Sequence, residues 1–200
     1  MRIIDISPLV TESSPVYSGD DPLSLRFAEN AHCRVGTLSM SAHLGAHVDA
    51  PLHLKRSGDI SEIELSALLG PCQVIELQKN FAIEAADLPE IDSSRVLIKT
   101  GFKSSVWTDS FPYLLPAAVQ KLIDAGVRVI GIDTPSIDAG ADETLPSHVL
   151  AIDAGILILE NLDLSAACAG HYQLVALPLK IKALDASPVR AVLLDFEENK

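Results

Sequence analysis

Residues 43–53 read His-Leu-Gly-Ala-His-Val-Asp-Ala-Pro-Leu-His and hold three of the six histidines of this 200-residue chain. Six histidines spread evenly would place fewer than one in such a window. Asp49 adds a carboxylate to His43, His47 and His53. Imidazole and carboxylate are common ligands of first-row metals, and three protein ligands with an open position are typical of a catalytic site. The segment therefore predicts a metal centre; the alternative is a set of polar loop residues with ordinary hydrogen bonds.

The spacing of these residues excludes a regular element for the whole segment. A helix would turn Asp49 and the last histidine about 200–280° away from the first, and Pro51 would interrupt that helix. A straight strand would separate the first and last histidines by about 33 Å. A re-entrant loop can bring all four together, with a permissive backbone at Gly45 and a fixed bend at Pro51.

Composition restricts the partners and the compartment. Lys and Arg number 15 against 27 Asp and Glu, a net charge of −12, which disfavours nucleic acid and membrane surfaces as partners. The odd cysteine count (Cys33, Cys72, Cys168) lacks CxxC spacing and indicates buried free thiols in a reducing compartment. Neither a signal peptide nor an apolar run near the ~20 residues of a membrane span is present. We expect a cytoplasmic protein.

The apolar pattern predicts one α/β domain over residues 1–200, with a mixed, strongly curved, barrel-like sheet and few covering helices. The continuous run Val127–Ile132 is expected to be covered on both faces. Three helices are predicted, at 62–69, 115–125 and 147–154, the last with Ser147 as its cap. Nine strands are predicted by their β-type composition, at 2–6, 24–28, 34–42, 72–77, 95–100, 127–132, 156–160, 173–177 and 189–194.

The histidine segment resembles the HxGTHxDxPxH signature of the metal-dependent cyclase-like hydrolases, with Ala46 where Thr is common. Asp5-Ile-Ser-Pro and Pro15-Val-Tyr-Ser-Gly-Asp resemble the N-terminal elements of that family. The remaining similarity is specific to its bacterial kynurenine formamidases and lies in Gly131-Ile-Asp-Thr-Pro-Ser, Ala176-Leu-Pro-Leu-Lys and Leu184-Asp-Ala-Ser-Pro-Val-Arg. The resemblance covers nearly the whole chain and implies a swivelling β/β/α fold.

The resemblance also implies a role for individual residues. His43, His47 and Asp49 would bind one divalent metal ion, and Asp49 would bridge to a second ion completed by His148 and Glu160. The metal would be zinc, with manganese as the alternative. His53 would be the catalytic acid/base. Tyr17 stands where the family has a substrate-contacting Trp, and Ser18 replaces a Pro. A homo-oligomer, dimer or tetramer, is implied as well.

The implied reaction is arylformamidase hydrolysis of N-formyl-L-kynurenine to L-kynurenine and formate, in tryptophan degradation by the kynurenine route. Two ions sharing a carboxylate can lower the pKa of a bound water toward ~7. A histidine suits proton transfer to the leaving aniline nitrogen, because its reference pKa is near neutrality. Four aromatic residues could form the wall of an aryl pocket or pack in the core: Phe102, Trp107, Phe111 and Tyr113.

Other classes of protein have less support. Covalent α/β-hydrolases need a GxSxG nucleophile motif, which the chain lacks. The zincin pattern HExxH is also missing, because Leu44 follows His43. Two alternatives stay open. One is hydrolysis of a related amide such as isatin by the same site, and the other is a non-catalytic metal-binding protein.

Overall fold

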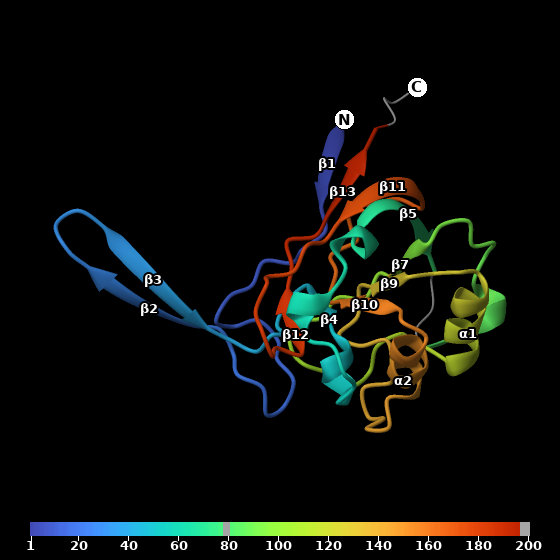
Figure 1. Cartoon of the computed structure of the whole chain (residues 1–200), viewed down its shortest axis with the longest axis horizontal. Helices are drawn as coiled ribbons and strands as arrows, with labels where there is room; N and C mark the ends of the chain where they lie inside the picture. Colours follow the sequence, from blue (N-terminus) through green and yellow to red (C-terminus); the bar gives the residue numbers. More distant parts are fainter. Residues whose placement is uncertain (78–80, 197–200) are drawn as a thin grey trace.

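A computed structural model describes residues 1–77 and 81–196 as a single domain built on a curved nine-stranded mixed sheet (Figure 1). From edge to edge the strands are β1 (Arg2–Asp5), β13 (Val192–Asp195), β11 (Gly170–Val175), β5 (Leu69–Glu76), β7 (Arg95–Lys99), β9 (Val129–Ile132), β10 (Leu157–Glu160), β4 (His47–Asp49) and β12 (Ala186–Pro188). The four strands from β5 to β10 run parallel, and the flanking pairs are antiparallel. The first strand, β1, and the last strand, β13, therefore pair at one edge of the sheet.

The central strands are buried on both faces, as their continuous apolar runs predict. All four residues of β9 are buried, which confirms the expectation for the run that ends at Ile132. Because successive side chains of a strand point to opposite faces, each central strand contributes side chains to two hydrophobic cores. On β7, Val96 and Ile98 pack in one core while Leu97 packs in the other.

Two helices cover one face of the sheet, α1 (Pro116–Asp124) and α2 (Pro146–Asp153) (Figure 1). The predicted helix 115–125 is confirmed: Pro116 occupies its first turn, and Gly126 follows with a left-handed φ of +77°. The prediction that Ser147 caps α2 is wrong, because Leu145 is the N-cap and Ser147 lies inside the first turn.

The predicted helix 62–69 is also wrong. Two short 3-10 turns, η2 (Ile60–Glu62) and η3 (Leu65–Ala67), lie there instead, and β5 begins at Leu69. The Asp59 carboxylate accepts a hydrogen bond from the Ser61 N–H and competes with helical bonding. From Leu69 onward, pairing with β11 holds the backbone in an extended conformation. Four further short elements complete the fold: η1 (Pro51–Leu54), η4 (Ala85–Asp87), β6 (Ala82–Ile83) and β8 (Tyr113–Leu114).

A two-stranded hairpin, β2 (Ser24–Glu29) and β3 (Arg34–Ser39), projects from the body of the protein (Figure 1). The predicted strand 34–42 ends three residues earlier, and every residue of the hairpin strands is exposed. Four of the exposed side chains are large and apolar: Leu25, Phe27, Val35 and Leu38. The expected burial of the free thiols holds for Cys72 but is wrong for Cys33, between the two strands, and for Cys168, which are exposed. Within the described residues, none of the helices has the length and apolar character needed to cross a bilayer.

Candidate metal centre

Strand pairing places three of the candidate residues on one face of the sheet. On β4, Val48 packs into the core on one side, so His47 and Asp49 point to the other. Antiparallel pairing sets Glu160 of β10 directly opposite His47. Ile158, which has the same orientation as Glu160, packs in the core that also contains residues of α2. The two β4 side chains and Glu160 therefore face the helix that carries His148.

The first turn of α2 supplies His148, and a buried carboxylate fixes it there. Leu145 offers no side-chain cap, and Asp138 takes that role by accepting the main-chain N–H groups of Ser147 (2.8 Å) and His148 (2.9 Å). The same carboxylate lies 2.7 Å from His148 Nδ1. The Nε2 atom of this imidazole is therefore the one that faces the cluster.

A tight turn before β4 orients the remaining histidines. Gly45 has a φ of +76°, and a Cβ there would meet Val10 Cγ2 at 2.5 Å, so the position requires glycine. The Gly45 carbonyl lies 2.9 Å from His47 Nδ1, which again leaves Nε2 toward the cluster. After β4, Pro51 starts η1, which carries His53. The predicted roles of Gly45 and Pro51 as turn residues are confirmed, whereas the middle of the predicted loop is a strand.

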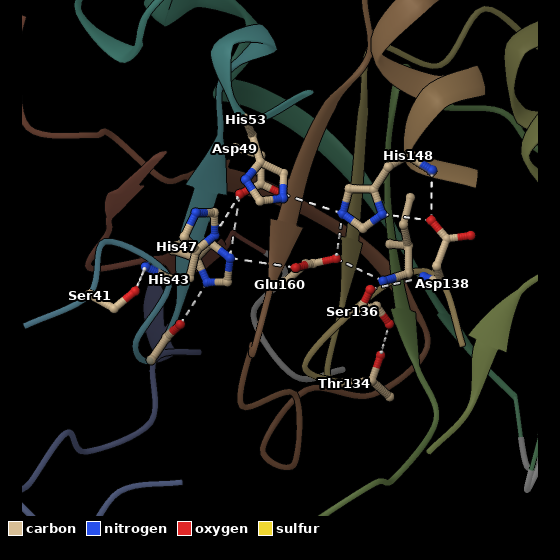
Figure 2. Close-up of polar contacts among 12 residues, drawn as sticks. Ser41, His43, His47, Asp49, His53, Thr134, Ser136, Asp138, His148 and Glu160 are labelled. Atoms are coloured by element: carbon tan, nitrogen blue, oxygen red, sulfur yellow. Dashed lines mark hydrogen bonds and ion pairs between the residues drawn. The ribbon is translucent and has the colours of Figure 1, made fainter. Parts of the chain in front are cut away.

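The cluster converges on Asp49 (Figure 2). Its Oδ1 lies 3.2 Å from His43 Nδ1 and 3.5 Å from His47 Nε2. Its Oδ2 lies 3.5 Å from His148 Nε2, which is also 3.2 Å from Glu160 Oε1. His43, His47 and Asp49 each offer one ligand atom within 4.8 Å of the others. This triad has the geometry to hold one ion.

A second triad of ligand atoms shares Asp49 with the first and combines it with His53 and His148. Glu160 contacts this group through His148, while its Oε1 accepts the Ile137 N–H at 2.7 Å. His53 is therefore close enough to ligate an ion, whereas the family resemblance implied only an acid/base role for it. A third triad consists of His43, His53 and Asp185.

Unpaired polar atoms indicate that the cluster is built for a cation. Among the described residues, the buried side-chain nitrogen and oxygen atoms without a hydrogen-bond partner are His47 Nε2, Asp49 Oδ1 and Asp49 Oδ2. Leaving such atoms unpaired costs about 1–3 kcal/mol each, and more for a charged group. All three belong to the first triad, and nitrogen and carboxylate oxygen suit zinc or manganese. The residues present therefore fit a metal ion.

When no cation is bound, protons on the site histidines compensate the negative charge of the buried carboxylates. Burial lowers the pKa of His43, but the neighbouring carboxylates of Asp49 and Asp185 outweigh it and raise that pKa to about 9. Burial also acts against the charged form of His148, yet the charge of Glu160 and hydrogen bonds to neighbouring carboxylates raise its pKa well above the usual value. Burial raises the pKa of Asp49, but the imidazoles of His148 and His43, 3.5 and 3.2 Å from its oxygens, keep it well below its ordinary value. A metal ion can replace these protons.

A cavity of about 430 Å³ opens onto the cluster. Tyr17 and Trp107 form part of its lining, and their rings meet edge-to-face with centroids 5.2 Å apart. Phe111 also lines the cavity but is 2% exposed and packs against Phe102 at 5.9 Å. The aromatic segment thus serves both as pocket wall and as core.

Comparison with known proteins places this site in a family. The family model Cyclase, described as "Putative cyclase", matches residues 4–139. The chain belongs to the Cyclase family. It is 41% identical to a kynurenine formamidase of Bordetella avium over 210 residues, covering 98% of this chain and 99% of the relative. It is 42% identical over 202 residues to a kynurenine formamidase of Delftia acidovorans, covering 96% and 97%. The resemblance read from the sequence is confirmed.

Solved structures of the Cyclase fold agree with the architecture. A structure described as a predicted metal-dependent hydrolase from Bacillus stearothermophilus matches with a TM-score of 0.84 at 32% identity, covering 96% of this chain and 97% of that one. Isatin hydrolase A from Labrenzia aggregata, bound to benzyl benzoate, matches with a TM-score of 0.79 at 24% identity, covering 96% and 93%. The predicted curved, mixed sheet with few helices is therefore confirmed.

The structure of this Cyclase member brings together all the residues predicted from the sequence: His43, His47, Asp49, His53, His148 and Glu160. Tyr17 lies at the same cavity. Two carboxylates that contact the site histidines, Asp185 and Asp138, were not among the predicted site residues. Asp185 falls in a segment that carried the family resemblance, Leu184-Asp-Ala-Ser-Pro-Val-Arg, and that similarity was the signal that could have revealed it.

Proposed function

We propose that this protein is a metal-dependent arylformamidase that hydrolyses N-formyl-L-kynurenine to L-kynurenine and formate. The observation that carries the proposal is the convergence of unpaired buried ligand atoms of His47 and Asp49 at the end of an open cavity. The kynurenine formamidases among its relatives, which match nearly the full chain, supply the substrate class.

The ligand set is the one that the family resemblance implies, and the contacts around Asp49 support it. His43, His47 and Asp49 would hold the first ion, and Asp49, His148 and Glu160 the second. Zinc is the proposed metal and manganese the alternative, since both accept nitrogen and oxygen ligands. When bound, the ions would lower the pKa of a water and stabilise the oxyanion of the tetrahedral intermediate.

His53 is the proposed acid/base residue. Its side chain lines the cavity and is 27% exposed, against 1% for His47, so it is the more accessible of the two to a substrate. It would take a proton from the attacking water and deliver it to the aniline nitrogen as the C–N bond breaks. Histidine suits both transfers because its reference pKa lies near neutrality.

The cavity wall provides a surface for the aryl ring. Tyr17, 49% exposed and edge-to-face with Trp107, would contact the substrate ring from the cavity mouth. Aromatic pairs of this geometry contribute about 0.5–1.5 kcal/mol beyond area burial. The family's Trp is thus replaced by a ring that adds a hydroxyl group, and this exchange would tune substrate preference.

A homo-oligomer, dimer or tetramer, is the proposed assembly, and the cytoplasm is the proposed compartment. An isolated two-stranded hairpin is marginally stable in water, and this one exposes Phe27, Val35 and Leu38 by half or more. A second copy would cover them. Size-exclusion chromatography with light scattering should therefore show a smaller species for Leu38→Asp than for wild type, and an unchanged mass would contradict the hairpin's role.

Formate release tests the function directly. Protein stripped with EDTA and then reloaded with zinc or manganese should release formate from N-formyl-L-kynurenine, and the stripped protein should not. His53→Ala should keep its metal content yet lose about 10²–10⁴-fold in rate. Nearly full formate release by metal-loaded His53→Ala would contradict the acid/base assignment.

The two alternative functions predict different results in these assays. A site that opens isatin faster than it releases formate would indicate a related cyclase-family amide hydrolase. Metal analysis after equilibrium dialysis addresses the non-catalytic reading, in which one inert ion binds and neither substrate reacts. A structural zinc site is normally closed by four side-chain ligands, and the cavity at this cluster argues against that.

A further inference from the structure

A carboxylate from the C-terminal part of the chain lies next to two of the site histidines. Asp185 directly precedes β12, whose Ala186 pairs with Asp49 of β4. The main-chain carbonyl of Asp185 accepts the Ala50 N–H at 2.8 Å. Sheet pairing therefore fixes the backbone of Asp185 relative to the strand that carries the centre of the cluster.

One oxygen of this carboxylate contacts both histidines. Asp185 Oδ2 lies 3.2 Å from His43 Nε2 and 3.5 Å from His53 Nδ1. The two rings are adjacent, with centroids 4.4 Å apart. A carboxylate oxygen has two lone pairs, so it can accept from both imidazoles at once.

The other site histidines show the same arrangement, in which one ring nitrogen is held by an oxygen and the second faces the cluster. The Gly45 carbonyl oxygen is within hydrogen-bond distance of His47 Nδ1, and the Asp138 carboxylate is within that distance of His148 Nδ1. Metal-ligating histidines generally donate their second N–H in this way, which fixes tautomer and ring orientation. For His43, the nitrogen nearest Asp49 is Nδ1, which leaves Nε2 for Asp185.

We propose that Asp185 is a positioning residue shared by the metal centre and the acid/base histidine. By accepting from His43 Nε2, it directs Nδ1 toward Asp49. By accepting from His53 Nδ1, it leaves Nε2 of that ring for proton transfer. The second half rests on the proposed function, because it presupposes that His53 moves protons.

The test compares Asp185→Asn with a matched control, Asp142→Asn. Asp142 is a carboxylate at the same cavity whose side chain accepts from Thr144. In the zinc-loaded wild type, nitrogen NMR of the histidine rings should show His53 as one tautomer, protonated at Nδ1. Asp185→Asn should convert that signal to a mixture of tautomers and weaken zinc binding about 10–100-fold in chelator competition. Asp142→Asn should change neither.

A double-mutant cycle separates positioning from a general structural effect. At saturating zinc, Asp185→Asn should lower kcat about 10–100-fold in the wild-type background. In a His53→Ala background the same change should have no further effect. An equal loss in both backgrounds, or an unchanged His53 tautomer and zinc affinity in Asp185→Asn, would overturn the proposal. The NMR and zinc measurements need no substrate, so they decide this proposal even if the wild type releases no formate.

Discussion

Raising the pH of the metal-free protein should destabilise it, because protons stabilise its empty site. The folded-state pKa of His43 is about 9, against an ordinary value of 6.5. A group whose pKa is raised on folding stabilises the protein fully below its unfolded pKa, and this contribution is lost as pH rises through the folded pKa. The stabilisation by His43 should therefore disappear between about pH 6.5 and 9.

The size of the effect follows from the same two values. At about 1.4 kcal/mol per pH unit, the difference between 6.5 and about 9 corresponds to about 3 kcal/mol. The pKa of His148 is also raised, which adds to the loss. The pKa values of Asp49 and Glu160 are lowered, so their contributions change only in acid. A loss of ~3 kcal/mol is large against a typical total of about 5–15 kcal/mol.

Urea unfolding at several pH values, with and without zinc, measures this effect. The EDTA-treated protein should lose about 3 kcal/mol from near-neutral to alkaline pH. The zinc-loaded protein should not, because its ligands must be deprotonated and metal affinity rises with pH. His43→Asn should flatten the slope of the metal-free protein. A metal-free protein whose stability stays constant or increases over this range would refute the reasoning.

Three further substitutions probe particular contacts. Asp138→Asn removes the anionic partner of His148 Nδ1, so the second metal should bind about 10–100-fold more weakly, as measured by zinc titration. Gly131→Ala places a Cβ against Leu97 Cδ2 in the centre of the sheet and should cost about 1–3 kcal/mol in urea unfolding while the metal content per folded chain is unchanged. Trp107→Ala removes an aromatic wall of the cavity, so KM for the aryl substrate should rise more than kcat falls in steady-state assays; an unchanged KM would place the ring elsewhere.

Long apolar runs made most of the sheet predictable. The apolar run of β9 is continuous because helices cover one face of the strand and a second core covers the other. Its burial on both faces can therefore be predicted from its residues alone. Strand β4 is different: His47 and Asp49 are each 1% exposed although both are polar. Their burial depends on pairing with β10 and on the site itself, and neither is visible in a three-residue pattern.

The candidate ligand residues could be predicted from the sequence, but the residues that orient them could not. His43 and His53 are close in sequence and stand out by composition. Asp185 lies 142 residues beyond His43, and its only signal was the family resemblance of the segment around it. Asp138 lies ten residues before His148 and is recognisable only once α2 is seen to lack a side-chain cap. Residues that orient ligands are set by tertiary packing, which a linear pattern does not contain.

The pairing of β4 with β10 and β12 also sets an order of events during synthesis. The histidine segment is synthesised before β10 and β12, the two strands that pair with β4. Contacts between segments so far apart form slowly and late in folding. A nascent chain therefore carries three histidines and Asp49 without these two neighbouring strands until β10 and β12 have been synthesised. We expect stable metal loading to follow completion of the chain, so that a C-terminal truncation before β12 should leave a chain that binds metal weakly.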